Sequence, residues 1–363
     1  MLAGGDNRAL YMLPEIAKIS KSECVTIRPD HIFSKLSMEH KSLIKAVMVF
    51  ALPILLIKMK IKDKKKIKFI YCTTCYAWDI LPAVLIKFIT GSEVICVSHD
   101  TPLQKEGYVF FRKKENMSIF KSFLFTALEK LQEFLVSFVD IPIAISEFAM
   151  SFFSEAIPRE RILLSSNGVP SVLTVDEADN SRIYDVVYVG RVIHRKNIPN
   201  LLKALSLKEF SRNLSLAFIS NSDETEIRKM MEENLLTDTV KTHIFHKATE
   251  KEKYDILKKA RISINISKDE NFSISTLESA SSGTALILSD SDFFKRIYKD
   301  SAIYVDPDKP DKIRSALDLL LNNESLMREM QAKAIRIAER YKYENLATNE
   351  YAGIIDRISE TDS

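Results

Sequence analysis

The stretch "SKDENFSISTLESASSGTALILSD", residues 267–290, decides how the second half of this chain folds. It continues the apolar run "ISINIS" and holds a helical pattern that stops at Gly283, before the next apolar run, "ALILSD". An apolar strand, a loop, a helix and another apolar strand are the repeating unit of a parallel sheet covered on both faces. We therefore expect such a sheet, with Glu270 just past the carboxyl end of its strand, where ligands bind in open α/β sheets.

Short apolar runs separated by helical patterns continue in both directions from this stretch. Before residue 147 the runs are "CVTI", "KFIYCTT", "EVICVSHD" and "IPIAIS", and after a break they are "YDVVYVG", "LSLAFIS", "THIFH", "ISINIS", "ALILSD" and "AIYVD". This pattern predicts an α/β protein of two Rossmann-like, doubly wound parallel-sheet domains. The seam "NGVPSVLTVDEADNSRI" has the composition of a linker. We place the domains at 1–170 and 171–340, and expect a C-terminal helix at 341–363 to lie against the first domain.

The composition is that of a globular protein, with 46% hydrophobic and 28% charged residues. The net charge of +3 is too small to argue for nucleic-acid binding. Cys72 and Cys75 form a C-x-x-C without a second pair, which gives no zinc site, and so few cysteines predict a reducing compartment. There is no signal-peptide pattern, and the apolar run "AVMVFALPILLI" is shorter than the roughly 20 residues of a spanning helix. We expect a cytoplasmic protein in which this run is a buried helix.

The loop and helix of the opening stretch carry residues suited to an anion. The first amides of a helix have no partner inside it, so they can receive a diphosphate, and the hydroxyls of Ser273, Ser275 and Thr276 can add donors. Two simpler interpretations stay open. Glu278 fits a capping box with Ser275, three residues earlier, and Glu270 fits a solvated loop residue.

A second candidate turn, "VGRVIHRK", follows the strand that begins the second half. Gly190 ends that strand, and Arg191 and Lys196 follow at the edge of the sheet where Glu270 is expected. Arginine binds a diphosphate as a fork and lysine as a point charge. The alternative is a solvated basic cluster of Arg191, Arg195 and Lys196.

Taken together, these motifs resemble those of the retaining GT-B glycosyltransferases of family 4, the glycosyl transferases group 1. The family's GR…K turn matches "GRVIHRK", and its E-x7-E motif matches "ENFSISTLESA". Weaker matches are "AGGDNRAL" for its opening Gly-Gly turn, "VSHD" for its histidine motif, "LLSSNGVP" for its Asn-Gly turn and "YVDPDKPDKIRSAL" for its Asp-Pro segment. The matches run in order from residue 3 to about residue 315, and those in the second half are the more specific.

The resemblance implies a GT-B fold whose two domains face a cleft, and a retaining hexosyltransferase that uses a nucleotide-diphosphate sugar. Arg191 and Lys196 would hold the donor diphosphate, Glu270 would contact the transferred sugar, and Glu278 would bind the ribose hydroxyls. His99 would reach the sugar from the opposite domain. The remaining donor-binding positions that it implies are Gly5, Gly190, Phe272, Ser273, Ser275 and Thr276. No D-x-D metal motif stands out, so we expect no metal and no resident cofactor.

The chain departs from the family pattern in its glycines. Asn271 and Ser273 stand where the family has glycine, and Ser275 stands where it has proline. Added side chains near a phosphate can block close approach of the backbone. A catalytically weakened GT-B subunit that serves binding or scaffolding is therefore the alternative function.

Two segments of the first half suggest contact with a membrane surface. "IKMKIKDKKKIKF", residues 57–69, is rich in lysine, and residues 108–139 mix basic residues with many aromatics. These features suit the anionic inner face of a membrane, with a lipid-linked sugar or another glycan as acceptor. The alternative is a solvated charged face beside a core helix.

Overall fold

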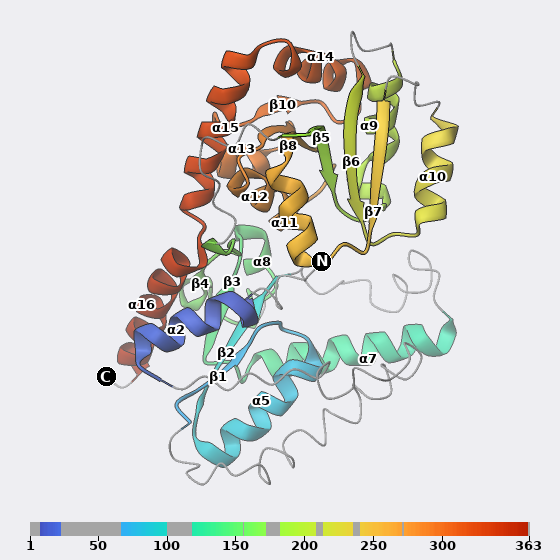
Figure 1. Cartoon of the computed structure of the whole chain (residues 1–363). Helices are drawn as coiled ribbons and strands as arrows, with labels where there is room; N and C mark the ends of the chain where they lie inside the picture. Colours follow the sequence, from blue (N-terminus) through green and yellow to red (C-terminus); the bar gives the residue numbers. More distant parts are fainter. Residues whose placement is uncertain are drawn as a thin grey trace. The chain divides into compact units, whose positions relative to one another are not determined.

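The computed structural model describes residues 8–22, 67–99, 118–154, 156–171, 182–207, 213–234, 240–270 and 272–361. The chain forms two compact units (Figure 1). The first unit comprises residues 4–166 with 346–363, and the second comprises residues 1–3 with 167–345. The predicted strand at 24–27, the predicted helix at 46–57 and most of the lysine-rich segment lie outside the described residues.

The second unit contains a six-stranded parallel sheet in the order β10-β9-β8-β5-β6-β7. Its strands are β5 (Tyr184–Val189), β6 (Leu214–Ser220), β7 (Val240–His246), β8 (Ala260–Asn265), β9 (Ala285–Ser289) and β10 (Ile303–Val305). The chain moves outward in one direction from β5 to β7 and returns to start β8 on the other side of β5. The strand order therefore reverses between β5 and β8, which is where open α/β sheets bind their ligands.

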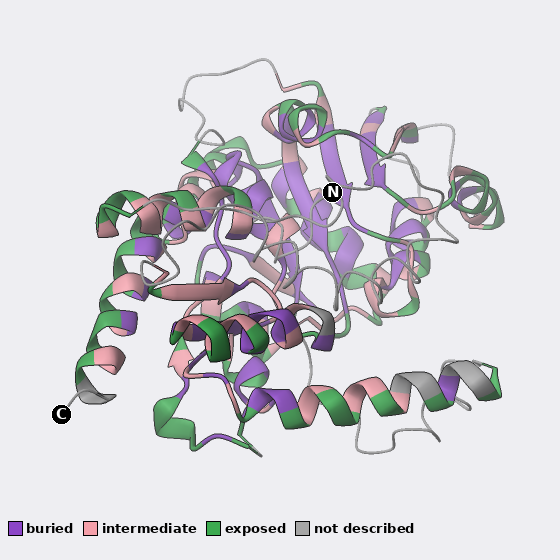
Figure 2. Ribbon diagram, turned by 90° about the horizontal axis from the view of Figure 1, so that it is seen from below, coloured by how far each residue is buried: buried purple, intermediate pink, exposed green. Residues whose placement is uncertain are grey.

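Both faces of this sheet are covered by helices. Val186 and Tyr188 of β5 belong to one buried cluster, and Val187 and Val189 belong to the other, because successive residues of a strand point to opposite faces. The first cluster involves α9 (Ile198–Ser206), α10 (Glu224–Glu233) and α14 (Pro310–Leu321). The second involves α11 (Glu250–Lys258), α12 (Ile274–Ser281) and α13 (Asp292–Tyr298), and α15 (Glu324–Glu339) contributes to both. Figure 2 shows the resulting buried strands.

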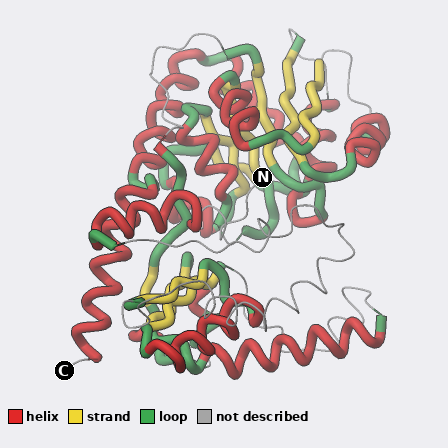
Figure 3. The backbone as a smooth tube through the Cα atoms, turned by 60° about the horizontal axis from the view of Figure 1, so that its bottom comes forward, coloured by secondary structure: helices red, strands yellow, loops and turns green. Residues whose placement is uncertain are grey.

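The first unit contains a four-stranded parallel sheet in the order β1-β2-β3-β4 (Figure 3). Its strands are β1 (Phe69–Cys72), β2 (Glu93–Ser98), β3 (Ile141–Ala144) and β4 (Leu163–Leu164). Its described helices are η1 (Arg8–Met12), α2 (Leu13–Ser20), α5 (Ala77–Thr90), α7 (Ile119–Val136), α8 (Glu147–Met150), η4 (Arg159–Arg161) and, from residue 346 on, α16 (Tyr343–Thr361). The predicted α/β class with two parallel sheets is confirmed, whereas β4 was not predicted.

A buried ion pair in the first unit joins segments that are far apart in the sequence. The side chains of Arg8 and Glu350 form this pair, and neither has any exposed surface. The Tyr71 hydroxyl donates to Glu350 Oε1 at 2.5 Å, and Arg8 Nη1 donates to the carbonyl oxygen of Ser166 at 2.7 Å. The cluster holds α16 to η1 and β1, because each buried charge depends on its partner.

Candidate functional site

Two polar segments meet at the reversal of strand order in the second unit. The turn after β5 contains Arg191 and ends in the short helix η6 (His194–Lys196), and the loop after β8 leads to Glu270. The backbone amide of Lys268 donates to the carbonyl oxygen of Arg195 at 2.8 Å. This hydrogen bond fixes the turn and the loop to each other, so the two predicted motifs form one site.

Gly190 is required by the side chain beneath the turn. A Cβ at this position would lie 2.7 Å from the hydroxyl oxygen of Tyr188, which is too close. The Tyr188 ring is buried and stacks on Phe218, with 4.7 Å between centroids, and its hydroxyl donates to the carbonyl oxygen of Arg191 at 3.0 Å. Burial raises the pKa of Tyr188, and the charge of Glu270 adds to this, so the hydroxyl keeps its proton and holds the turn.

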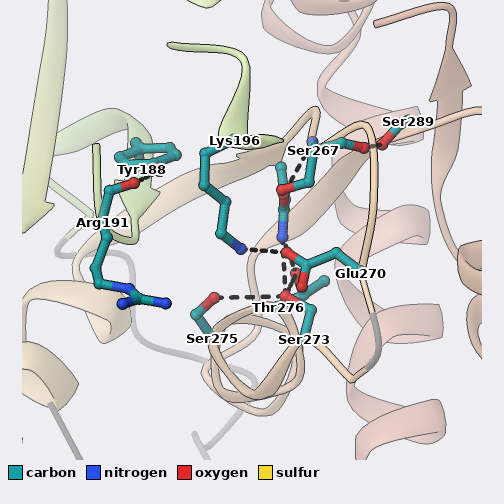
Figure 4. A network of polar contacts seen from close by, with 10 residues as sticks. Tyr188, Arg191, Lys196, Ser267, Glu270, Ser273, Ser275, Thr276 and Ser289 are labelled. Atoms are coloured by element: carbon teal, nitrogen blue, oxygen red, sulfur yellow. Dashed lines mark hydrogen bonds and ion pairs between the residues drawn. The ribbon is translucent and has the colours of Figure 1, made fainter. Parts of the chain in front are cut away.

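Lys196 and Glu270 form an ion pair at the centre of the site (Figure 4). Their side chains are 11% and 6% exposed, respectively. Glu270 is therefore not the solvated loop residue of the simpler interpretation. The Glu270 carboxylate is shielded from solvent because it is paired with the ammonium of Lys196.

Arg191 differs from Lys196 in that it is exposed. Its guanidinium has no hydrogen bond or ion pair with any residue that the structure describes. In the view of Figure 4 it extends on the same side of the site as Lys196 and the Ser275 hydroxyl. A planar fork of N–H donors is thus available to an anion.

The helix α12 begins at Ile274, with Ser273 as its N-cap and no side-chain capping bond. The predicted capping box between Ser275 and Glu278 is therefore wrong. The N-cap hydroxyl has other partners, because Ser273 Oγ receives a hydrogen bond from Asn265 Nδ2 at 2.9 Å and lies 2.8 Å from Thr276 Oγ1. The amides of the first turn have no acceptor within the helix and remain suited to an anion.

The three predicted hydroxyl donors are not equivalent. Ser273 and Thr276 are 5% and 2% exposed and belong to a buried network, whereas Ser275 is more exposed. The network continues through Asn265, whose Oδ1 accepts from Ser267 Oγ at 2.6 Å. Sequence reasoning missed Asn265, although an asparagine inside the apolar run "ISINIS" is a signal that it needs buried partners.

Glu278 lies in a second ion pair, with Lys253 of α11. Lys253 Nζ is 2.7 Å from Glu278 Oε1, and each side chain is 3% exposed. Glu250 lies 2.7 Å from the same ammonium, and the Tyr254 hydroxyl lies 3.4 Å from Glu278 Oε1. Lys253 was also missed, although the neighbouring residues Ile256 and Leu257 show that it occupies the apolar face of its helix.

The other predicted site residues have no described contact in this network. The Phe272 ring packs at an angle of 60° against Tyr341, with centroids 6.2 Å apart, so it contributes to packing. His99 belongs to the first unit, where its Nε2 donates to the carbonyl oxygen of Thr73 at 2.9 Å. Burial, and then the charge of Arg8, lower the pKa of His99 to about 3, so the ring is neutral. Gly5 lies outside the described residues.

Solved structures with two parallel-sheet units of this kind define the class as the GT-B fold. One is Anabaena HepE in complex with UDP and glucose, with a TM-score of 0.61, 14% identity and coverage of 89% of this chain and 83% of that one. Another is a glycosyltransferase from Rickettsia africae, with a TM-score of 0.66, 13% identity and coverage of 99% and 96%. At these identities the likeness establishes the fold.

The second unit also matches a family by sequence. Residues 176–338 match the family model of the glycosyl transferases group 1, the family that the motifs of this half resemble. The poly(glycerol-phosphate) alpha-glucosyltransferase of Bacillus subtilis is 28% identical over 185 residues. The match spans 50% of this chain but only 26% of that relative.

Proposed function

We propose that the chain is a retaining glycosyltransferase that moves a sugar from a nucleotide-diphosphate donor to a glycan or lipid-linked acceptor. The observation that carries this proposal is the meeting of Arg191, Lys196, Glu270 and the start of α12 at the strand reversal of a family-matched sheet. The second unit is then the donor-binding domain, and the first is the acceptor-side domain.

The proposed chemistry follows from the charges at this site. When the bond between the sugar and the phosphate breaks, negative charge grows on the leaving nucleoside diphosphate. Arg191, Lys196 and the first amides of α12 are donors that can stabilise that charge. Lys196 would exchange part of its contact with Glu270 for the phosphate, which leaves Glu270 to accept hydrogen bonds from the transferred sugar.

UDP-glucose is the first donor to test. The curated relative is named as an alpha-glucosyltransferase, and HepE was solved with UDP and glucose. Transfer that yields an α-linked glucose from an α-linked donor is retaining, in agreement with the proposed class. In the first unit, neutral His99 would contact the donor sugar as a hydrogen-bond partner.

Contact with a membrane surface is a further part of this proposal. No helix within the described part of the chain is long and apolar enough to cross a bilayer. The first unit nevertheless exposes large apolar side chains on α5 and α7, with Phe88 at 69%, Phe123 at 70% and Phe134 at 62%. Aromatic side chains of this kind suit the interface of an anionic membrane.

Vesicle sedimentation tests the membrane contact. The chain should bind vesicles that contain phosphatidylglycerol, and binding should weaken with salt and in Phe123→Ser. Phe148→Ser, at a 48% exposed position on α8 of the same unit, is the matched control. Equal binding to neutral and anionic vesicles, or none at low salt, would contradict it.

A non-catalytic binding or scaffold subunit is the competing function. The side chain of Ser273 in place of the family's glycine favours it, as does the ion pair that engages Glu278. The assembled pair of Lys196 and Glu270 beside Arg191 argues against it, because a scaffold does not need these charges together.

Thermal-shift and calorimetric titrations distinguish the two functions. We expect UDP, GDP or one of their sugars to raise the unfolding temperature of the second unit. Arg191→Ala should weaken binding of the nucleoside diphosphate by about tenfold or more while binding of the nucleoside changes little, since the guanidinium contacts only phosphate. No stabilisation by any nucleotide would favour the scaffold function.

A further inference from the structure

Lys253 has a buried ammonium group, and the sequence gives no reason for its burial. It lies in α11 with its side chain 3% exposed, between the carboxylates of Glu250 and Glu278. The helix has its own N-terminal capping box, formed by Thr249 and Glu252, so its stability does not depend on Lys253. Stability alone does not require an ion pair here, because replacing both partners of a buried pair by packed apolar groups is often neutral or stabilising.

The geometry around Glu278 shows what the lysine does. Oε1 of Glu278 is the atom that contacts both Lys253, at 2.7 Å, and the Tyr254 hydroxyl, at 3.4 Å. Neither of these contacts involves Oε2. The carboxylate is thus held by one oxygen and presents the other, which can accept hydrogen bonds from the hydroxyls of a ligand.

The position of Glu278 makes that ligand part of the donor. Glu278 lies in α12, one turn after Ser275. The first amides of this helix form the proposed phosphate site together with Lys196 and Arg191. An unpaired carboxylate so close would repel a diphosphate, whereas the ammonium of Lys253 offsets its charge. A carboxylate that is neutralised and held in one orientation is suited to a vicinal diol such as a ribose.

We infer that Lys253 is a positioning residue for the ribose of the donor: it holds Glu278 through Oε1 as an ionised acceptor, with Oε2 directed to the sugar hydroxyls. This inference rests on the proposed function, since it assumes that a nucleotide binds to the second unit. Lys253 does not touch the ligand, and its effect is transmitted through Glu278. It therefore predicts a loss of selectivity for ribose in particular, and not a general weakening of nucleotide binding.

The pH dependence of binding separates this role from simple packing. Burial raises the pKa of Glu278, and the charge of Lys253 opposes that rise. The two carboxylates outweigh burial and raise the pKa of Lys253, so the lysine is charged at neutral pH. Without Lys253, the pKa of Glu278 would rise further. Glu278 would then take up a proton at a higher pH than in the wild type, and once protonated it would lose its capacity as a charged acceptor.

The other groups around Glu278 limit the interpretation of such a titration. Tyr254 and Glu250 face it from the same helix as Lys253. The other elements packed against α12 are α15, β8 and β9. Of these, β9 has no charged residue, and those of α15 and β8 form no described contact with Glu278: Arg261, Glu324, Arg328, Glu329, Lys333, Arg336 and Glu339.

The test compares UDP with 2′-deoxy-UDP by calorimetry between pH 6 and pH 8. At pH 8 the wild type should prefer UDP by about tenfold, since a hydrogen bond to a charged group is lost in the deoxy ligand. In Lys253→Met the preference should fall to about twofold, and it should shrink further as the pH falls. Lys253→Arg should restore most of it, and Lys203→Met, at an exposed lysine of α9, should match the wild type.

The ratio of the two affinities is measured on one variant, so a smaller folded fraction cancels from it. If Lys253→Met does not fold, Lys253→Gln provides the same comparison with a neutral polar side chain. An unchanged ratio and an unchanged pH profile in the variant would overturn the inference and leave the proposed function intact. Failure of the wild type to bind UDP, GDP or their sugars would overturn the proposed function, and the inference with it.

Discussion

The two glutamates of the E-x7-E motif are each paired with a lysine, but their surroundings differ. Glu270 lies in a loop, and its pair with Lys196 retains some exposure. Glu278 lies in a helix, and its pair with Lys253 is enclosed by Glu250 and Tyr254. The first pair has room to open when a ligand arrives, whereas the second is fixed by its neighbours.

An ion pair at a binding site can therefore have one of two roles. It can open to bind the ligand, or it can act as a frame that holds a ligand-binding residue in place. Exposure and the number of additional partners distinguish the two cases here. The pair of Lys196 and Glu270 should therefore affect catalysis more than stability, and fully enclosed pairs should affect stability. Four experiments test the comparison, in order of decreasing effect.

The largest effect is expected at the enclosed pair that lies outside the site. Arg8→Met should destabilise the first unit by about 3–5 kcal/mol, because Glu350 would remain buried without its partner. The fluorescence of Trp78, the single tryptophan of the chain and a residue of α5, can follow this unit in urea. Arg228→Met, which breaks an exposed pair on α10, is the control and should change stability by less than about 0.5 kcal/mol. A loss of UDP affinity in Arg8→Met would contradict the division into frame and ligand site.

A change to the pair of Lys196 and Glu270 should affect catalysis strongly and stability little. Glu270→Gln keeps the shape of the side chain and should lower kcat for sugar transfer about 10²–10³-fold, the loss typical for one group that acts in the transition state. The free energy of unfolding should change less than in Arg8→Met. Release of nucleoside diphosphate from the preferred nucleotide sugar provides the assay. An equally large loss of stability would show that this pair is a frame as well.

The packing of Gly190 on the Tyr188 hydroxyl can be disturbed without removing a charge. Gly190→Ala places a Cβ against the Tyr188 hydroxyl, and we expect a loss of about 1–3 kcal/mol in the stability of the second unit. Gly190→Ala/Tyr188→Phe removes that hydroxyl and should recover part of the loss. If the double variant gains nothing, the hydroxyl is not the source of the clash.

The smallest effect concerns the neutral histidine of the first unit. The pKa of His99 is lowered to about 3, while the unfolded chain has its ordinary value near 6.5. The unfolded state therefore binds a proton that the folded state does not, and stability is lost as the pH falls below about 6.5. His99→Gln should reduce the fall in unfolding free energy between pH 6.5 and pH 5.5 by about 1 kcal/mol. Parallel pH profiles for variant and wild type would contradict a neutral His99 in the folded state.

Much of the second unit was predictable from the sequence. Its strands are continuous apolar runs such as "DVVYV" and "ALILS", and a parallel sheet buried on both faces requires such runs. The positions of Arg191, Lys196 and Glu270 at strand ends followed from the same pattern. In contrast, β4 has two residues, and a strand of that length has no periodicity that a sequence can show.

The side-chain pairings were not predictable, because they depend on contacts between distant elements. Lys253 and Glu278 are 25 residues apart, and a lysine in a charged helix is usually solvated. Arg8 and Glu350 are 342 residues apart. The capping box failed for a related reason, since Asn265 of the preceding strand engages the Ser273 hydroxyl and Lys253 engages the glutamate.

The path of the chain through α16 bears on the order in which the protein is synthesised and folded. Apart from three N-terminal residues, the second unit is one continuous segment, 167–345, and can complete its core as soon as that segment leaves the ribosome. The first unit is translated earlier, yet Arg8 obtains its counterion only when Glu350 emerges. The earlier half therefore gains this buried ion pair only after the later half has been translated.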